Sequence, residues 1–152
     1  MFYTSYRELA DSLFNKIKDY SFIQMDAESA YEIVTNYIRP ACINFENCKQ
    51  DLSDRDDELK TFNFKLTDNS FEILVNYMVI EWLKSNYILT GQALKARMTT
   101  ADFYKYDNKD MLSKCIELKN NLMAENKQLE INKSYKHSKL YDIAANKKKV
   151  FK

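Results

Sequence analysis

The sequence predicts an all-α protein, a small bundle of about four to five helices with a long central helix and an extended C-terminal tail. Its 152 residues suit a single domain with a real core. They include one Gly and one Pro, and because these residues interrupt regular elements, their scarcity favours a few long helices over a sheet with many tight turns. Apolar residues also recur at helical spacing in several segments.

The first predicted helix begins at Ser5, where Ser5 and Glu8 have the spacing of a capping box. Its apolar stripe consists of Leu9, Leu13, Ile17 and Tyr20. Asp26 is a suitable cap for a second helix, and Pro40 should bend or break that helix. The apolar positions of the second helix are Ala30, Tyr31, Val34, Tyr37, Ile38, Ala41, Phe45 and Cys48.

Residues 50–67 lose the helical period and concentrate charge, so they predict a long connection that Phe62, Phe64 and Leu66 anchor on the core. Its acidic run, DLSDRDDE, raises the question of calcium binding. A calcium loop needs a Gly at its sharp turn and ligands at fixed alternate positions, and this run has neither. We therefore expect a solvated loop.

The central helix is expected from residue 69 to about 86, with Thr67 or Asp68 as its cap. Its polar side shifts along its length, which predicts different neighbours at its two ends. The core stripe that stays apolar throughout consists of Phe71, Val75, Met78 and Trp82. Asn76, Glu81 and Lys84 interrupt the apolar residues of 73–89, so this stretch is not expected to span a membrane.

A short segment through Met98 and a turn in TTADFYKY should lead to a last long helix capped by Asp107 and Asp110. Its predicted stripe consists of Met111, Cys115, Leu118, Leu122 and Leu129, with Leu112, Ile116 and Met123 beside it. The helical period ends beyond Ile131. The expected organisation is a helical body over residues 1–130 and a tail over 131–152.

The tail differs from the body in charge, because it carries seven lysines against Asp142, whereas residues 1–130 have 16 basic and 21 acidic residues, net −5. It also contains aromatic and aliphatic residues, in which a purely solvating tail would be poorer. Two interpretations are open, a segment that folds onto a partner and a frayed chain end.

The residues that most enzymes need are missing or isolated. The only histidine, His137, lies in the tail without a carboxylate or cysteine at ligand spacing, so the body has no base to activate a serine. Gly91 alone cannot form a phosphate-binding loop, and three cysteines without a C-x-x-C favour neither disulfides nor zinc. We expect no enzyme activity, no cofactor and no metal.

The opening MFYTSYRELADSLF lacks the pattern of a secretory signal, so cytoplasmic synthesis is expected.

The segments CKQDLSDRDDELKTFNFKLTDNSFEILVNYMVIEWL and ALKARMTTADFYKY, followed by a capped helix, resemble the head-to-tail connector proteins of tailed bacteriophages, also called adaptor, head-completion or neck proteins. The likeness is best over residues 45–130. It rests most on the Asp-rich loop with Phe62, the VIEWL of residues 79–83 and the Asp102-Phe103 turn. The last helix departs from the family pattern, since YDNKD stands where the family has Ser-Pro after the Tyr, although Asp107 can cap equally well.

The resemblance implies a virion structural protein made in the host cytoplasm and located at the head-tail interface. It would form a homo-oligomeric ring, twelvefold to match the portal, and join the portal protein to the next neck or tail component. Packaged DNA would pass through the lumen without sequence-specific contact. The C-terminal segment would dock on the portal, and in this chain that assigns docking to Lys133, Tyr135, Lys136, Lys139, Leu140, Tyr141 and Ile143.

Two other interpretations stay open. One is a small helical DNA-binding protein that uses the lysine-rich tail as an electrostatic arm, although the acidic body counts against it. The other is a regulatory protein that sequesters a partner through its apolar helices.

Overall fold

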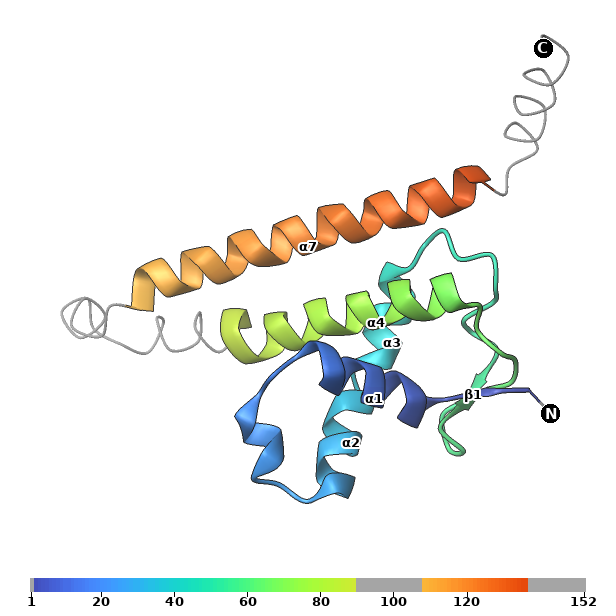
Figure 1. The fold of residues 1–152 in the computed structure, drawn as a ribbon, viewed down its shortest axis with the longest axis horizontal. Coiled ribbons are helices and arrows are strands. Elements are labelled where there is room, and N and C mark those ends of the chain that lie inside the picture. The colour runs from blue at the N-terminus through green and yellow to red at the C-terminus, as the bar shows by residue number, and fades with distance from the viewer. Residues whose placement is uncertain (1, 90–107, 137–152) are drawn as a thin grey trace, which may run out of the picture.

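A computed structural model describes residues 2–89 and 108–136 and confirms a predominantly helical fold (Figure 1). Its helices are α1 (Tyr6–Lys16), the 3-10 helix η1 (Tyr20–Ile23), α2 (Ala27–Thr35), α3 (Ile38–Asn44), α4 (Asp68–Leu83), the π-helical segment η2 (Lys84–Leu89) and α7 (Asn108–Lys136). The short segment predicted through Met98, the turn in TTADFYKY and the tail beyond Lys136 lie outside the described residues. In the part that is described, no helix is long and apolar enough to cross a membrane.

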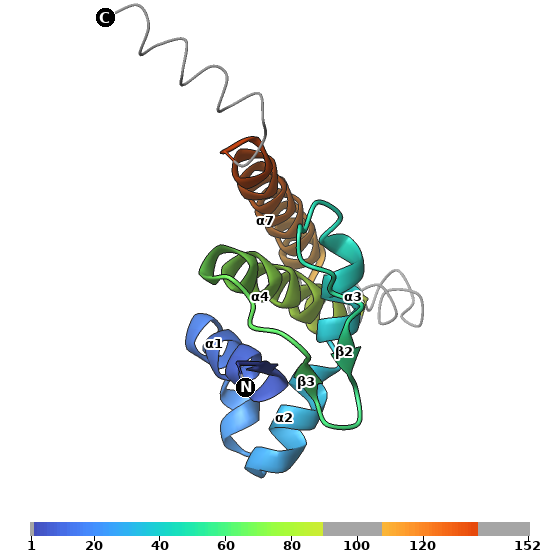
Figure 2. The ribbon, with the colours of Figure 1, turned by 90° about the vertical axis from the view of Figure 1, so that its right-hand side faces the viewer.

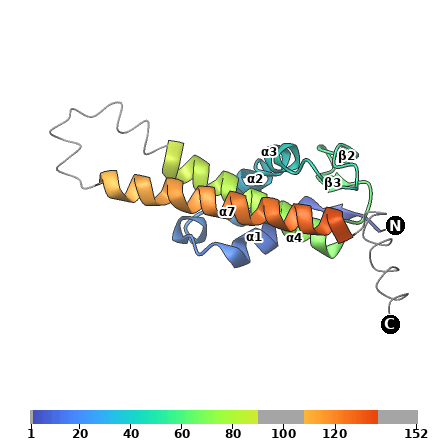
Figure 3. The same ribbon diagram turned by 90° about the horizontal axis from the view of Figure 1, so that it is seen from above.

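Helix α4 lies at the centre of the arrangement and packs against α1, α3 and α7. Figures 1 and 2 place α7 on one side of α4 and the pair α1 and α2 on the other. Seen from above in Figure 3, α7 runs along α4 for most of the length of α4. The predicted central helix is therefore the element that joins the other helices.

Three of the predicted N-terminal caps are present, and the fourth, at Asp107, lies outside the described residues. The side chain of Ser5 accepts a hydrogen bond from the backbone N–H of Glu8, that of Asp26 from Ser29, and that of Thr67 from Ser70. Each bond satisfies a backbone donor that has no partner inside the first helical turn. The beginnings of α1, α2 and α4 thus follow from local sequence.

The predicted second helix is broken, and the break comes before Pro40. Helix α2 ends at Thr35 and α3 begins at Ile38, which places Pro40 within the first turn of α3. A proline is tolerated there, because backbone N–H groups of the first turn have no acceptor within the helix. The chain therefore turns at Asn36 and Tyr37 and forms two short helices.

A small antiparallel sheet, which the sequence did not predict, joins the N-terminus to the 50–67 connection. Strand β3 (Thr61–Phe62) lies between β1 (Thr4–Ser5) and β2 (Arg55–Asp56). Thr4 pairs with Phe62, and Arg55 pairs with Phe62 from the other side. Two of the predicted anchors of this connection, Phe62 and Leu66, are buried, whereas Phe64 is half-buried at the edge of the core.

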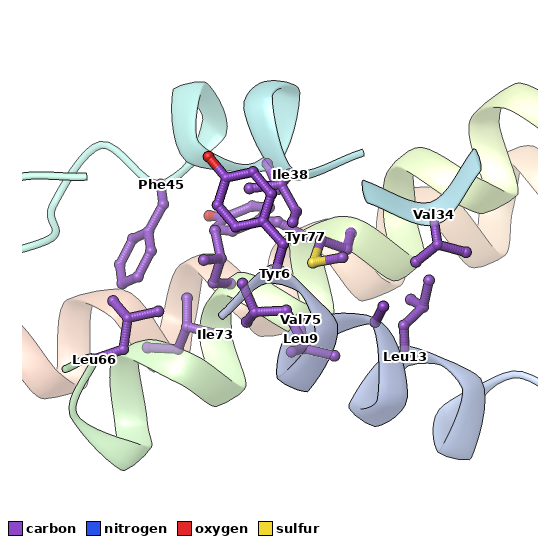
Figure 4. Packing of buried hydrophobic residues seen from close by; sticks show 14 of the residues in the cluster. Tyr6, Leu9, Leu13, Val34, Ile38, Phe45, Leu66, Ile73, Val75 and Tyr77 are labelled. Atoms are coloured by element: carbon purple, nitrogen blue, oxygen red, sulfur yellow. The ribbon is translucent and has the colours of Figure 1, made fainter. Parts of the chain in front are cut away.

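The core forms where α1, α3 and α4 meet, as Figure 4 shows with Leu9, Ile38 and Tyr77 among others. Of the predicted core stripe of α4, Val75 and Met78 are fully buried, whereas Phe71 and Trp82 are half-buried at the core margin. The predicted stripe was too narrow, because α4 has neighbours on several sides. The other buried side chains of α4 are Ser70, Ile73, Leu74, Tyr77, Ile80 and Leu83.

Helix α7 differs most from its prediction. It continues to Lys136, past the expected boundary between body and tail at residue 130. Of its predicted stripe, Met111, Leu118 and Leu129 are about half exposed, while the polar Asn126 and Glu130 are buried against the body. The helix thus turns a partly polar face toward α4.

Candidate interaction surfaces

The contact of α7 with the body includes the apolar Leu122 and Met123 and four hydrogen-bonded polar residues of α7, which we call the clasp: Asn126, Lys127, Glu130 and Lys133. Asn126 is 2% exposed, and its amide donates to the carbonyl of Ile73 at 3.1 Å. Its Oδ1 accepts from Asn76, also at 3.1 Å. Asn76 in turn accepts from the Lys16 ammonium at 2.6 Å, so a chain of hydrogen bonds connects α1, α4 and α7.

Glu130 is the most buried charged group of the clasp, with its carboxylate fully out of contact with solvent. It accepts a hydrogen bond from the Tyr77 hydroxyl at 3.1 Å and a longer one from the backbone N–H of Asn47 at 3.4 Å. The Lys127 ammonium lies 3.4 Å from the same carboxylate and donates to the carbonyl of Asn44 at 2.9 Å. Burial, followed by the Glu130 charge, raises the pKa of Tyr77 above its usual range. The hydroxyl therefore stays protonated and continues to donate.

Lys133 fastens the last part of α7 to the beginning of α4. Its ammonium donates to the hydroxyls of Ser70 and Thr67, and Thr67 is the residue that caps α4. Burial lowers the pKa of Lys133 below its usual value. This lysine belongs to the internal packing of the body, which differs from the expectation that it docks on a partner.

The clasp explains why the apolar side of α7 remains exposed. Met111 and Leu129 are 18 residues apart in the sequence, which is five full turns, so they lie on one line of the helix. Glu130 is displaced from this line by about 100°. With Asn126 and Glu130 turned toward α4, the line of Met111, Leu118 and Leu129 points to the side, where these residues are 54%, 50% and 47% exposed.

We call Met111, Cys115, Leu118, Leu122 and Leu129 the α7 strip. Cys115 and Leu122 are half-buried, and Leu122 packs against the core. The strip borders a groove of about 200 Å³ that also includes Val79 and Ile80 of α4 and Lys16 of α1. An exposed apolar line beside a groove is typical of a surface that another helix covers.

A second apolar surface lies at the C-terminal end of α1, where Phe14 packs edge-on against Phe22 and Tyr31. These rings line a cavity of about 510 Å³ between α1, η1 and α2. Ile23 at this cavity is 76% exposed. The cavity is open and could accept an apolar side chain of a partner.

A third surface lies at the other end of α1, where Phe2, Tyr3 and Leu59 are 85%, 55% and 74% exposed. Tyr3 and Leu59 line a shallow depression of about 350 Å³. The Tyr6 hydroxyl, which donates to Asp57 at 2.6 Å, holds the neighbouring loop against α1. We call Phe2, Tyr3 and Leu59 the N-terminal patch.

The acidic run in the 50–67 connection performs local structural roles. Asp51 accepts from the backbone and hydroxyl of Ser53, and Asp56 accepts from the backbone of Glu58 and Leu59. Asp54 accepts from the side chain of Asn63. Within residues 2–89 and 108–136, no group of three or more histidines, cysteines and carboxylates could hold a metal ion.

Most of the residues predicted to dock on the portal fall beyond what can be placed. Tyr135 and Lys136 belong to the end of α7, and their side chains are outside the described set. Lys139, Leu140, Tyr141 and Ile143 lie outside the described residues, as does His137. Only Lys133 is described, and it binds α4.

Sequence reasoning missed the clasp. The spacing of Asn126, Glu130 and Lys133 places them on one face of a predicted helix, but polar residues at such a spacing are ordinarily expected to face solvent. Comparison of the chain with models of protein families, with curated proteins and with solved structures gives no match.

Proposed function

We propose that this chain is a non-enzymatic structural protein of a bacteriophage neck. It forms a ring beneath the portal, joins the DNA-filled head to the tail and extends the DNA channel. The proposal starts from the resemblance of residues 45–130 to head-to-tail connector proteins. The observation that carries it furthest is the presence of two different apolar surfaces at the two ends of α1, the aromatic cavity and the N-terminal patch.

A closed ring needs such a pair of surfaces, because each subunit contacts its two neighbours through different faces. The cavity lined by Phe14, Phe22 and Tyr31 is concave, whereas Phe2 projects from the chain with 85% of its surface exposed. The two surfaces adjoin one another, because Tyr31 lines both the cavity and the depression beside the N-terminal patch. In the proposed ring, the N-terminal patch of one subunit lies against the cavity of the next.

The segment that docks on the portal begins after Lys136 in this proposal. Lys133 is bound to Ser70 and Thr67, so the residues available for docking are those that follow α7. Residues 137–152 hold five lysines against Asp142, together with Leu140, Tyr141 and Ile143. Such a segment can offer both apolar anchors and positive charge to a partner.

The acidic body suits the proposed channel. Residues 1–130 have a net charge of −5, and like charge keeps a polyanion such as DNA from adhering to a wall. The next neck or tail component would bind the face of the ring away from the portal. In the infected cell, the protein would be made in the cytoplasm and become part of the virion.

The test is to mix the purified full chain with portal rings and image the product by electron microscopy. The proposal expects rings stacked on the portal. Removing residues 137–152 should leave a folded helical body, judged by circular dichroism, that no longer attaches. Attachment unchanged by the truncation would reject the docking role, and an absence of portal binding by the full chain would reject the neck function.

A titration with double-stranded DNA at low salt distinguishes the alternative. Phosphate-driven binding weakens by orders of magnitude between about 50 and 200 mM salt when several phosphates are contacted. Tight, salt-sensitive DNA binding without portal binding would favour a DNA-binding protein over a neck protein.

A further inference from the structure

The α7 strip is nearly symmetrical about Asn120. Met111 and Leu129 lie nine residues on either side of it, and Leu118 and Leu122 lie two residues on either side. If two copies of α7 packed antiparallel about this point, Met111 would meet the partner's Leu129, and Leu118 would meet the partner's Leu122. An antiparallel second copy therefore matches apolar residues with apolar residues at four of the five strip positions, while Cys115 faces the partner's Glu125.

The charges beside the strip follow nearly the same symmetry, since Lys114 and Glu125 lie six and five residues from Asn120. Lys114 and Glu125 are both exposed, and neither forms a hydrogen bond or ion pair with a described residue. They are 11 residues apart, which is close to three full turns, so they lie on the same flank of α7. An antiparallel pair brings Lys114 beside the partner's Glu125 at both ends of the contact. A parallel twofold pair would place this flank of the two copies on opposite sides of the contact, so neither Lys114 nor Glu125 would meet its opposite charge.

The clasp holds the strip in the position that such a contact needs. Because Asn126, Glu130 and Lys133 fix the rotation of α7 on α4, the strip is held outward along about 27 Å of helix. Val79 and Ile80 extend its apolar surface into the neighbouring groove. Helices that associate along one line of apolar side chains commonly carry charged residues beside that line.

We propose that the free protein forms a twofold dimer in which the α7 strips of two copies pack antiparallel, with Lys114 of each beside the partner's Glu125. This dimer goes beyond the neck function and does not depend on it. It covers the exposed strip while the protein is in solution, because a twofold pair closes on itself and leaves no further strip to extend the assembly.

The first test is sedimentation or light scattering of the full chain over a range of concentrations. The wild-type chain should be a dimer at micromolar concentration. Leu118→Ser should raise the dimer dissociation constant at least about tenfold, since it removes one apolar contact from each copy. Ile131→Ser is the matched control, because Ile131 lies on the same helix, is 53% exposed and is about 200° away from Leu129. It should leave the dissociation constant unchanged.

The second test examines the antiparallel direction through charge. Lys114→Glu alone and Glu125→Lys alone should each weaken the dimer severalfold, because each creates two like-charge contacts. The double variant should restore wild-type association. A wild-type chain that is monomeric at about 100 µM would overturn the proposal. Three other results would also overturn it. These are equal effects of Leu118→Ser and Ile131→Ser on the dissociation constant, a double variant that does not restore dimerisation, and a wild-type ring in solution. None of these results bears on portal binding, which is measured separately.

Discussion

The Tyr77 hydroxyl of α4 donates a hydrogen bond of 3.1 Å to the Glu130 carboxylate of α7, and both side chains are almost completely buried. This pair joins α4 and α7, the two longest helices among the described residues. A buried carboxylate is tolerated only where hydrogen bonds and an opposite charge replace its water, and here Tyr77, Asn47 and Lys127 do so.

Glu130→Ala should therefore be strongly destabilising. It leaves the Tyr77 hydroxyl without its acceptor and the Lys127 ammonium without its nearest buried counter-charge, so we expect a loss of about 2 to 4 kcal/mol in the free energy of unfolding. Urea denaturation followed by circular dichroism measures this loss. Glu117→Ala is the control on the exposed side of α7, where a change within about 0.5 kcal/mol is expected. Equal effects of the two substitutions would contradict the importance of the Glu130 contact.

Asn126→Ala tests the second buried group of the clasp. The substitution removes the donor to the carbonyl of Ile73 and the acceptor for Asn76, and should cost about 1 to 3 kcal/mol. Asn120→Ala is the control, because Asn120 is exposed on the same helix and its replacement should be nearly neutral. In a double-mutant cycle, Asn76→Ala combined with Asn126→Ala should cost less than the sum of the two single changes. Simple additivity would show that the two amides do not interact.

Trp82 lies half-buried at the core margin, and its indole ring packs edge-on against Tyr87 with 5.4 Å between ring centroids. Its buried Nε1 has no hydrogen-bond partner among the described residues. Trp82→Phe keeps an aromatic ring and removes this donor, so it should change stability by less than about 1 kcal/mol. Trp82→Ala should cost about 2 to 3 kcal/mol, less than full burial would imply. A phenylalanine variant as unstable as the alanine variant would contradict this expectation.

Tyr6→Phe should lower stability by about 1 kcal/mol near neutral pH, because it removes the hydrogen bond to Asp57. That bond is the main cause that holds the pKa of Asp57 below its usual value. A carboxylate whose folded pKa is lowered contributes stability above its unfolded pKa of about 4 and loses it as the pH falls through the folded pKa. The difference in stability between wild type and Tyr6→Phe should therefore become smaller as the pH falls. Thermal denaturation between about pH 7 and 2 can measure this change. A difference that does not depend on pH would rule out this linkage.

Local signals were sufficient for much of the fold. The caps at Ser5, Asp26 and Thr67 were predictable because each acts within its own first turn. The effect of Pro40 was also predictable, although the exact position of the break was not. The sheet was not predictable, since its strands have two residues each and the pairing of Thr4 with Phe62 joins distant segments without any alternation of apolar and polar residues.

The candidate surfaces were less predictable than the helices that carry them. The apolar pattern of α7 indicated that Met111, Leu118 and Leu129 would be buried, because such a pattern weighs hydrophobicity alone. The structure buries Asn126 and Glu130 instead, since α4 offers them hydrogen-bond partners. Which polar residues find partners depends on the three-dimensional arrangement, and one sequence does not reveal it.

The hydrogen bonds from Lys133 to Thr67 and Ser70 also determine how a force on the C-terminus would act on the fold. Helix α7 ends at Lys136, within one turn of this attachment, and the Glu130 and Tyr77 contact lies one turn before it. A force applied to the C-terminal segment would therefore act on α4, the helix with the most buried side chains. It would stretch several hydrogen bonds at the same time, so α7 would not separate from α4 one turn at a time.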